Sequence, residues 1–97
     1  MFIVSLRYVV PIEDVEPHME GHMAWLEKHY ASGTFIASGR KVPRTGGVIL
    51  ARGDREALEA CLSEDPFAVH GIAEVEITEC AISRTAEGLG ALRVRTH

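Results

Sequence analysis

Two titratable residues stand where the hydrophobic pattern of this sequence predicts apolar ones. His22 lies within the apolar stripe of one predicted helix, and Asp65 stands at the end of the stripe of another. A buried carboxylate without a partner costs several kcal/mol, and an imidazole is a suitable partner. An imidazole held in this way can act as a general acid or base near neutral pH. We therefore predict a His22–Asp65 pair. The alternative is that Asp65 only caps or ends its helix and that His22 is a satisfied core histidine.

A second group of candidates consists of His18 and His22, four residues apart on the same predicted helix, with His29 on the same side. This spacing could supply two metal ligands. The string around them is not the HExxH motif, because Glu20 stands one position too late and points away from the histidine face. Since no third ligand is evident, we expect neither a metal nor another cofactor.

The segment 38–47 is the densest cluster of positive charge in an otherwise acidic chain. It could hold an anionic group of a substrate, because glycines permit close approach of the backbone and arginine binds anions. The alternative is a solvated hairpin loop. The segment has no GxxxxGK[ST] pattern and is not a P-loop. The candidate substrate contacts are Ser38, Gly39, Arg40 and Phe67.

The elements that must position these residues follow from hydrophobic periodicity. Alternation with a period of two predicts strands at 2–10, 34–38, 48–52 and 73–82, with a loop at 39–47. Spacings of three and four predict one helix from an N-cap at Asp14 to Gly33, with Pro17 in its first turn. A second helix is predicted from a cap at Asp54 to Pro66, followed by one more turn at 67–71.

This order, βαββαβ, predicts a ferredoxin-like α+β fold with two helices on one face of an antiparallel sheet. No element of this chain is then left to cover the other face, which bears Ser5, Arg7, Glu74, Glu76 and Thr78. Because such a mixed face is buried most simply against a second copy, we expect a homodimer. The length predicts one domain over 1–97, in which 83–97 form a tail.

The composition narrows the class of partner. The net charge is −4 and the basic residues form no stripe, which argues against nucleic acid. No apolar run approaches the roughly 20 residues that a bilayer requires, so we expect no membrane span. Cys61 and Cys80 lie in apolar patterns without CxxC spacing, which is typical of free thiols in a reducing compartment. We therefore predict a cytoplasmic protein with a small-molecule ligand.

Three segments resemble the YCII-related (YciI-like) family: Gly-His-Met-Ala-Trp-Leu at 21–26, Gly-Thr-Phe-Ile-Ala-Ser-Gly-Arg at 33–40, and Glu-Asp-Pro-Phe at 64–67 with Gly71 after it. The resemblance runs from residue 1 to about residue 82. It implies a ferredoxin-like dimer of the dimeric α/β-barrel group, with an active site formed by a His–Asp pair that corresponds here to His22 and Asp65. Many members of the family have a proline in place of Arg40, so this chain departs from them at a candidate ligand contact.

The chemistry implied by the resemblance includes dehydrochlorinase-type elimination from a chlorinated hydroquinone. The wider barrel group includes cofactor-free monooxygenases and lactone isomerases. We accordingly expect an enzyme of lyase or isomerase type acting on a small cyclic or anionic compound. His22 would be the general acid–base group, Asp65 would orient it, and Arg40 would contact an anion. The competing hypothesis is a non-catalytic ligand-binding or accessory module in which the same pair is a structural link between helices.

Overall fold

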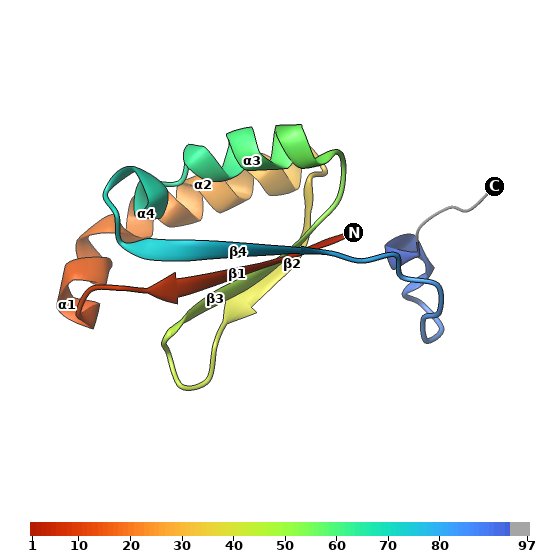
Figure 1. Ribbon diagram of the computed structural model, residues 1–97, viewed down its shortest axis with the longest axis horizontal. Coiled ribbons are helices and arrows are strands. Elements are labelled where there is room, and N and C mark those ends of the chain that lie inside the picture. Colours follow the sequence, from red (N-terminus) through yellow and green to blue (C-terminus); the bar gives the residue numbers. More distant parts are fainter. Residues whose placement is uncertain (94–97) are drawn as a thin grey trace.

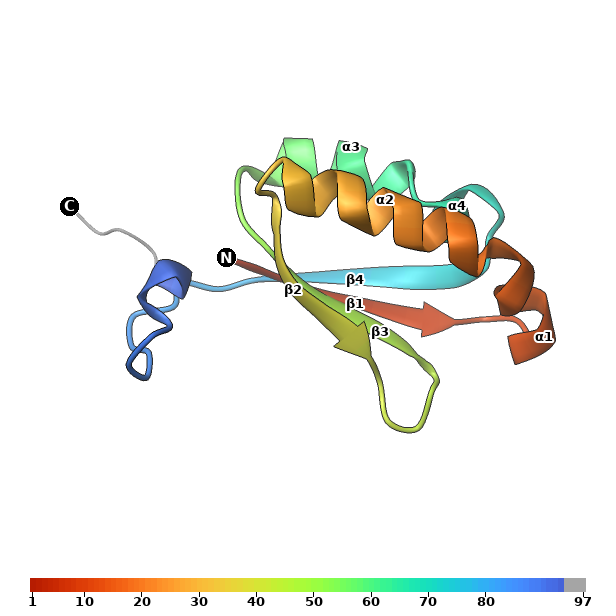
Figure 2. The same cartoon turned by 180° about the vertical axis from the view of Figure 1, so that it is seen from behind.

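The computed structural model describes residues 1–93. They form a four-stranded antiparallel sheet with the longer helices on one face (Figures 1 and 2). The strands lie in the order β2-β3-β1-β4. Along the chain the elements are β1 (Phe2–Tyr8), α1 (Ile12–Val15), the 3₁₀ helix η1 (Glu16–His18), α2 (Met19–Ala31), β2 (Phe35–Arg40), β3 (Gly46–Ala51), α3 (Arg55–Ser63), α4 (Pro66–Val69), β4 (Ala73–Glu79) and the 3₁₀ helix η2 (Gly90–Leu92). The predicted ferredoxin-like α+β fold is therefore confirmed.

The core lies between the sheet and the helices. Alternate residues of the central strand β1 are buried on the helix side, as the period of two predicts. They meet apolar side chains from α2, α3 and α4, and the buried core residues include Phe2, Leu6, Trp25, Phe35, Leu58 and Phe67. The stripe predicted for the first helix did not include Trp25. Its indole is buried, and its Nε1–H donates to the backbone carbonyl of Cys61 at 3.0 Å, which ties α2 to α3.

The first helix is broken at Pro17, contrary to the sequence prediction. Asp14 is not an N-cap but lies inside α1, which begins directly after Pro11. The earlier start moves Pro17 beyond the first turn, to a position where a helix needs the N–H that proline lacks. The chain passes this point as the 3₁₀ helix η1, and the regular helix α2 begins only at Met19. His18 and His22 therefore stand on two different elements.

The hairpin of β2 and β3 is tighter than predicted. Its connection is 41–45, because residues 39, 40, 46 and 47 belong to strands. At Gly46 a Cβ atom would lie 1.8 Å from the carbonyl oxygen of Leu6, so only glycine fits where β3 meets β1. The glycines that suggested a loop thus serve close strand packing. As a result Arg40 is a strand residue, paired with Gly47.

The opposite face of the sheet carries Ser5, Arg7, Glu74, Glu76 and Thr78. Arg7 and Glu74 form an ion pair on it. In the part of the chain that the structure describes, no helix covers this face (Figure 1). Beyond β4 the chain leads away from the sheet, and residues 94–97 of the predicted tail lie outside the described residues. Within 1–93 no helix is long and apolar enough to cross a membrane.

Candidate functional site

The side chains of His22 and Asp65 are in direct contact. His22 Nδ1 lies 2.8 Å from Asp65 Oδ1, and the two side chains are only 12% and 3% exposed. The same Oδ1 also accepts a hydrogen bond from the backbone N–H of Phe67 at 3.0 Å. The structure therefore brings together the two residues that the sequence analysis paired, and their catalytic role stays a prediction.

Asp65 is placed by the junction between α3 and α4. Asp54 caps α3, as predicted, by accepting a hydrogen bond from the Ala57 N–H, and the helix ends at Ser63. Asp65 is then the N-cap of α4, with Pro66 in the first helical position. Asp65 thus caps a helix, as the alternative to a His22–Asp65 pair predicted. It also contacts His22. Its carboxylate connects the start of α4 with the first turn of α2.

His22 is placed by a close contact between α2 and α4. At Gly21 a Cβ atom would lie 3.1 Å from the ring of Pro66, so glycine lets the two helices approach. The imidazole then stacks on Phe67, with ring centroids 4.0 Å apart and an interplanar angle of 4°. Tyr8 packs edge-on against Phe67 at 5.8 Å. Stacking and the contact with Asp65 together fix the orientation of the imidazole ring.

This orientation determines which nitrogen is available for chemistry. A carboxylate can only accept hydrogen bonds, so the proton of the neutral imidazole resides on Nδ1 and points at Asp65. Nε2 then carries a free lone pair on the opposite side of the ring. It can take a proton from a ligand, and the carboxylate stabilises the imidazolium that results. Such an arrangement is suited to general acid–base chemistry.

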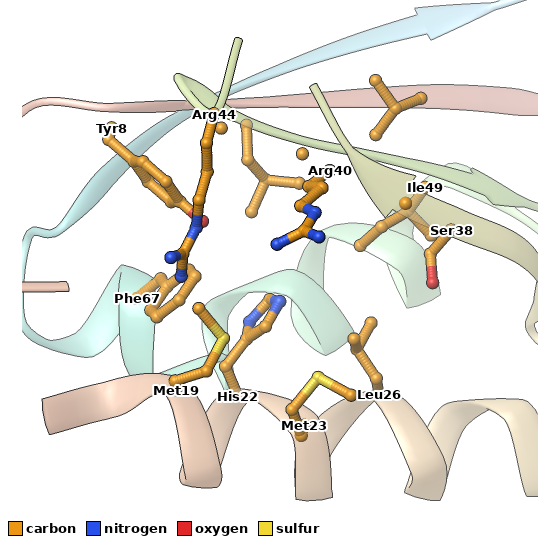
Figure 3. Close-up of a pocket in the computed structure, with 15 residues that line it drawn as sticks. Tyr8, Met19, His22, Met23, Leu26, Ser38, Arg40, Arg44, Ile49 and Phe67 are labelled. Carbon is orange, nitrogen blue, oxygen red and sulfur yellow. The ribbon is translucent and has the colours of Figure 1, made fainter. Parts of the chain in front are cut away.

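A cavity of about 420 Å³ adjoins His22, between α2 and the β2–β3 hairpin. Figure 3 shows the imidazole projecting from α2 into this space, with Arg40 on the opposite side. The apolar walls come from both layers and consist of Leu6, Met19, Met23, Leu26, Ile49 and Phe67. A volume of this size lies within the range of small-molecule sites.

The predicted contact residues Ser38, Gly39, Arg40 and Phe67 all line this cavity. Ser38 and Arg40 lie on the helix-facing side of β2, since they pair with Ile49 and Gly47 of β3. The Ser38 hydroxyl accepts a hydrogen bond from Tyr30 at 2.6 Å, which joins β2 to the end of α2. Their assignment to substrate binding stays a prediction.

Two polar residues of the cavity, Tyr8 and Arg44, were not among the predicted contacts. Arg44 donates to Glu16 Oε1 at 2.8 Å, and this hydrogen bond raises the pKa of the guanidinium. The hydroxyl of Tyr8 lies beside it (Figure 3). The alternation of β1 places Tyr8 on the buried face of the strand and so predicts a core residue. The sequence signal for a cavity residue was the polar hydroxyl of Tyr8 at the last position of this otherwise apolar face.

The other histidines among the described residues do not join His22. His18 stacks on His70 with ring centroids 4.3 Å apart, and His29 lies 3.2 Å from Glu64. The hydrogen bond with His29 and a second with Lys28 lower the pKa of Glu64. Within residues 1–93 no group of three or more His, Cys, Asp or Glu side chains is arranged to hold a metal ion.

Cys61 is the remaining nucleophile in this region. Burial raises the pKa of its thiol to about 11, and the nearby charge of Glu64 acts in the same direction. The thiol is therefore protonated at neutral pH, and a thiol is a far weaker nucleophile than a thiolate. Cys61 serves the packing of α3, as its place in the apolar stripe predicts.

The comparisons with known proteins agree with this fold and identify the family of the chain. A family model described as the YCII-related domain matches residues 1–81. The chain belongs to this family. No curated protein matches the sequence significantly.

One solved structure with a similar fold is 5-chloro-2-hydroxyhydroquinone dehydrochlorinase from Burkholderia phenoliruptrix in complex with 2,5-dihydroxybenzoquinone. The TM-score is 0.69, and the match covers 82% of this chain and 93% of that chain at 16% sequence identity. At this identity the likeness shows a shared fold, of the dimeric α/β-barrel type.

Proposed function

We propose that the protein is a small-molecule enzyme of lyase or isomerase type in which His22 is the general acid–base group. The observation that carries this proposal is the fixed imidazole at the wall of a cavity, with Nδ1 held by a buried carboxylate. Asp65 is the positioning residue. It holds one tautomer of the imidazole and favours the protonated form when that form appears during reaction.

The reaction that fits this arrangement moves a proton within or from the substrate. Nε2 of His22 takes a proton from a hydroxyl or an acidic carbon, and the electron pair left behind shifts within the substrate. In an elimination that pair expels a leaving group. In an isomerisation the imidazolium returns the proton at another atom, so a single acid–base group serves both steps.

The cavity walls favour a ring compound as substrate. Methionine and leucine side chains of α2 face apolar residues of the sheet across the cavity. Such walls bind flat apolar surfaces, and a few polar groups at the edge fix their orientation. The dehydrochlorinase of similar fold is described with a dihydroxylated quinone bound, and this supports hydroxylated rings as the first compounds to test here.

A non-catalytic binding module is the second candidate. Asp65 would be needed for folding even without a reaction, because it caps α4 and satisfies the Phe67 N–H. In this case His22 would be a polar link between α2 and α4, and the cavity would hold a ligand without changing it.

A substrate screen separates the two candidates. We expect turnover of at least one hydroxylated aromatic compound or lactone, followed by absorbance and, for chlorinated rings, by chloride release. Turnover by the protein that disappears in His22→Ala supports the enzyme. Saturable binding of these compounds without turnover supports the module and contradicts the proposed function.

We also propose that the protein is a homodimer that buries the open face of the sheet. Ile3 lies on this face, 37% exposed, between Leu50 and Thr78 of the neighbouring strands. Light scattering at micromolar concentration should give twice the chain mass of 10.6 kDa. Ile3→Glu should shift the mass to that of the monomer, because it replaces an apolar side chain of the buried contact with a charge.

The matched control for this substitution is Val69→Glu. Val69 is 65% exposed and lies on α4, on the helix side of the molecule. Its replacement should leave the dimer intact. A monomer in the unsubstituted protein would contradict the proposed assembly.

A further inference from the structure

We propose that the substrate of this cavity is a single-ring compound bearing a carboxylate, and that Arg40 binds this carboxylate across the cavity from His22. The inference rests on the proposed small-molecule site and names the class of ligand that the site takes. Its basis is the distribution of charge around the cavity, the position of Arg40 on β2, and the size of the space.

The charges around the cavity leave one cation without a partner. No aspartate or glutamate is among the residues that line it. His22 is held by Asp65, and Arg44 is held by Glu16. Within residues 1–93 the guanidinium of Arg40 makes no hydrogen bond or ion pair. An apolar cavity with one unpaired cation has a positive potential, which concentrates anions.

The fold aims this cation at the middle of the site. Arg40 pairs with Gly47 on the helix-facing side of the sheet, and Gly47 has no side chain to occupy the space beside it. The guanidinium extends from the strand toward the imidazole of His22 (Figure 3). A guanidinium offers two parallel N–H donors, a geometry that matches the two oxygens of a carboxylate.

Arg44 has a different role in this arrangement. Its guanidinium bonds to Glu16 of η1, so the tip of the β2–β3 hairpin is joined to the segment before α2. Arg44 lines the cavity beside Tyr8 (Figure 3). A ligand that bound Arg44 would compete with the Glu16 carboxylate for the same guanidinium, whereas Arg40 has no such competitor among the described residues.

The volume of the cavity limits the size of the ligand. A volume of about 420 Å³ lies at the lower end of the range for small-molecule sites. One ring fits between the apolar walls, with its carboxylate at Arg40 and an acidic hydroxyl at His22 Nε2. The two polar groups then stand on opposite sides of the ring.

The test compares two ligands of similar shape that differ in the charge of one group, 4-hydroxybenzoate and 4-hydroxybenzamide, by isothermal titration calorimetry at low ionic strength. We expect the protein to bind the benzoate about 10-fold more tightly than the benzamide. Arg40→Gln should remove this preference while the affinity for the benzamide is unchanged. Because the arginine is exposed to solvent, the preference should also shrink as salt is added.

Two matched variants make the assignment specific. Lys41→Gln removes the same charge one residue further along the chain at a side chain that does not line the cavity, and it should keep the preference. Arg44→Gln should keep it as well. Equal affinity for the two ligands, binding of neither at millimolar concentration, or loss of the preference in Lys41→Gln or Arg44→Gln but not in Arg40→Gln would overturn the proposal.

Because the measurement is of binding, its failure is distinguishable from failure of the proposed function. Preferential benzoate binding without turnover of any compound contradicts the enzyme and supports the assignment of Arg40. Turnover of an uncharged ring by a protein with no preference for the benzoate supports the acid–base site and contradicts the assignment. Thermal unfolding of Arg40→Gln should match that of the unsubstituted protein, since Arg40 has no partner within residues 1–93.

Discussion

His22→Asn should lower kcat by about 10²–10⁴-fold for any substrate that the screen identifies, the range expected on losing a general acid–base group. The asparagine amide can still donate a hydrogen bond to Asp65, so the buried carboxylate keeps a partner and the fold is retained. It cannot accept or release a proton near neutral pH. The measurement is steady-state kinetics together with ligand affinity, which should change far less than kcat because the cavity walls are intact.

The matched control is Met23→Leu. Met23 lies next to His22 on α2 and also lines the cavity, but it has no group that transfers protons. Its replacement should alter KM while kcat stays within a few-fold. Wild-type kcat in His22→Asn would remove His22 from the mechanism, whatever its effect on binding.

Asp65→Ala should reduce the free energy of unfolding by about 2–4 kcal/mol, since it removes a helix cap and the partner of His22 together. The Phe67 N–H and the imidazole would both lose their acceptor in a buried region. Asp65→Asn keeps an oxygen for the cap and should cost less stability. It should lower kcat by at least about 10²-fold, because an amide does not stabilise the imidazolium and does not fix its tautomer.

Asp54→Ala is the control for Asp65→Ala, and chemical denaturation measures the free energy of unfolding of both variants. Asp54 caps α3 through one hydrogen bond at 2.8 Å, as Asp65 caps α4, but it is exposed and contacts no histidine. We expect it to cost about 1 kcal/mol. An equal cost at the two positions would show that the contact with His22 contributes nothing to stability. Full activity in Asp65→Asn would show that the carboxylate is only structural.

The periodicity of the sequence predicted the order of the strands and main helices, and it suggested the pairing of His22 with Asp65, which the resemblance to the YCII-related family then supported. Both results depend on local patterns: alternation in β1, the cap at Asp54, and two titratable residues that interrupt apolar stripes. The Asp-Pro step at 65–66 also marks a helix start at the sequence level, because proline favours the first helical position. The Asp-Pro step therefore places the Asp65 carboxylate at the start of a helix, to within one helical turn.

The features that sequence reasoning missed depend on contacts between distant segments. Gly46 was read as a loop residue, although it is needed where β3 passes the backbone of Leu6. The predicted stripe of the first helix omits Trp25, whose hydrogen-bond partner is a carbonyl on α3. Arg44 is fixed by Glu16, 28 residues away. No local pattern contains such partners, so the polar edge of the cavity could be predicted only in part.

The stacked aromatic side chains of the site also provide an optical probe. The sequence contains one tryptophan, and the ring of Trp25 lies 5.5 Å from that of His22. A protonated imidazole close to an indole quenches its fluorescence, and the ring of His29 lies at a similar distance of 5.6 Å, so the emission of a His29→Gln variant reports the protonation state of His22. Ligands that enter the cavity and shift that state should change the same emission. Proton uptake at the proposed base can thus be followed in a stopped-flow instrument before any coloured product or known substrate is available.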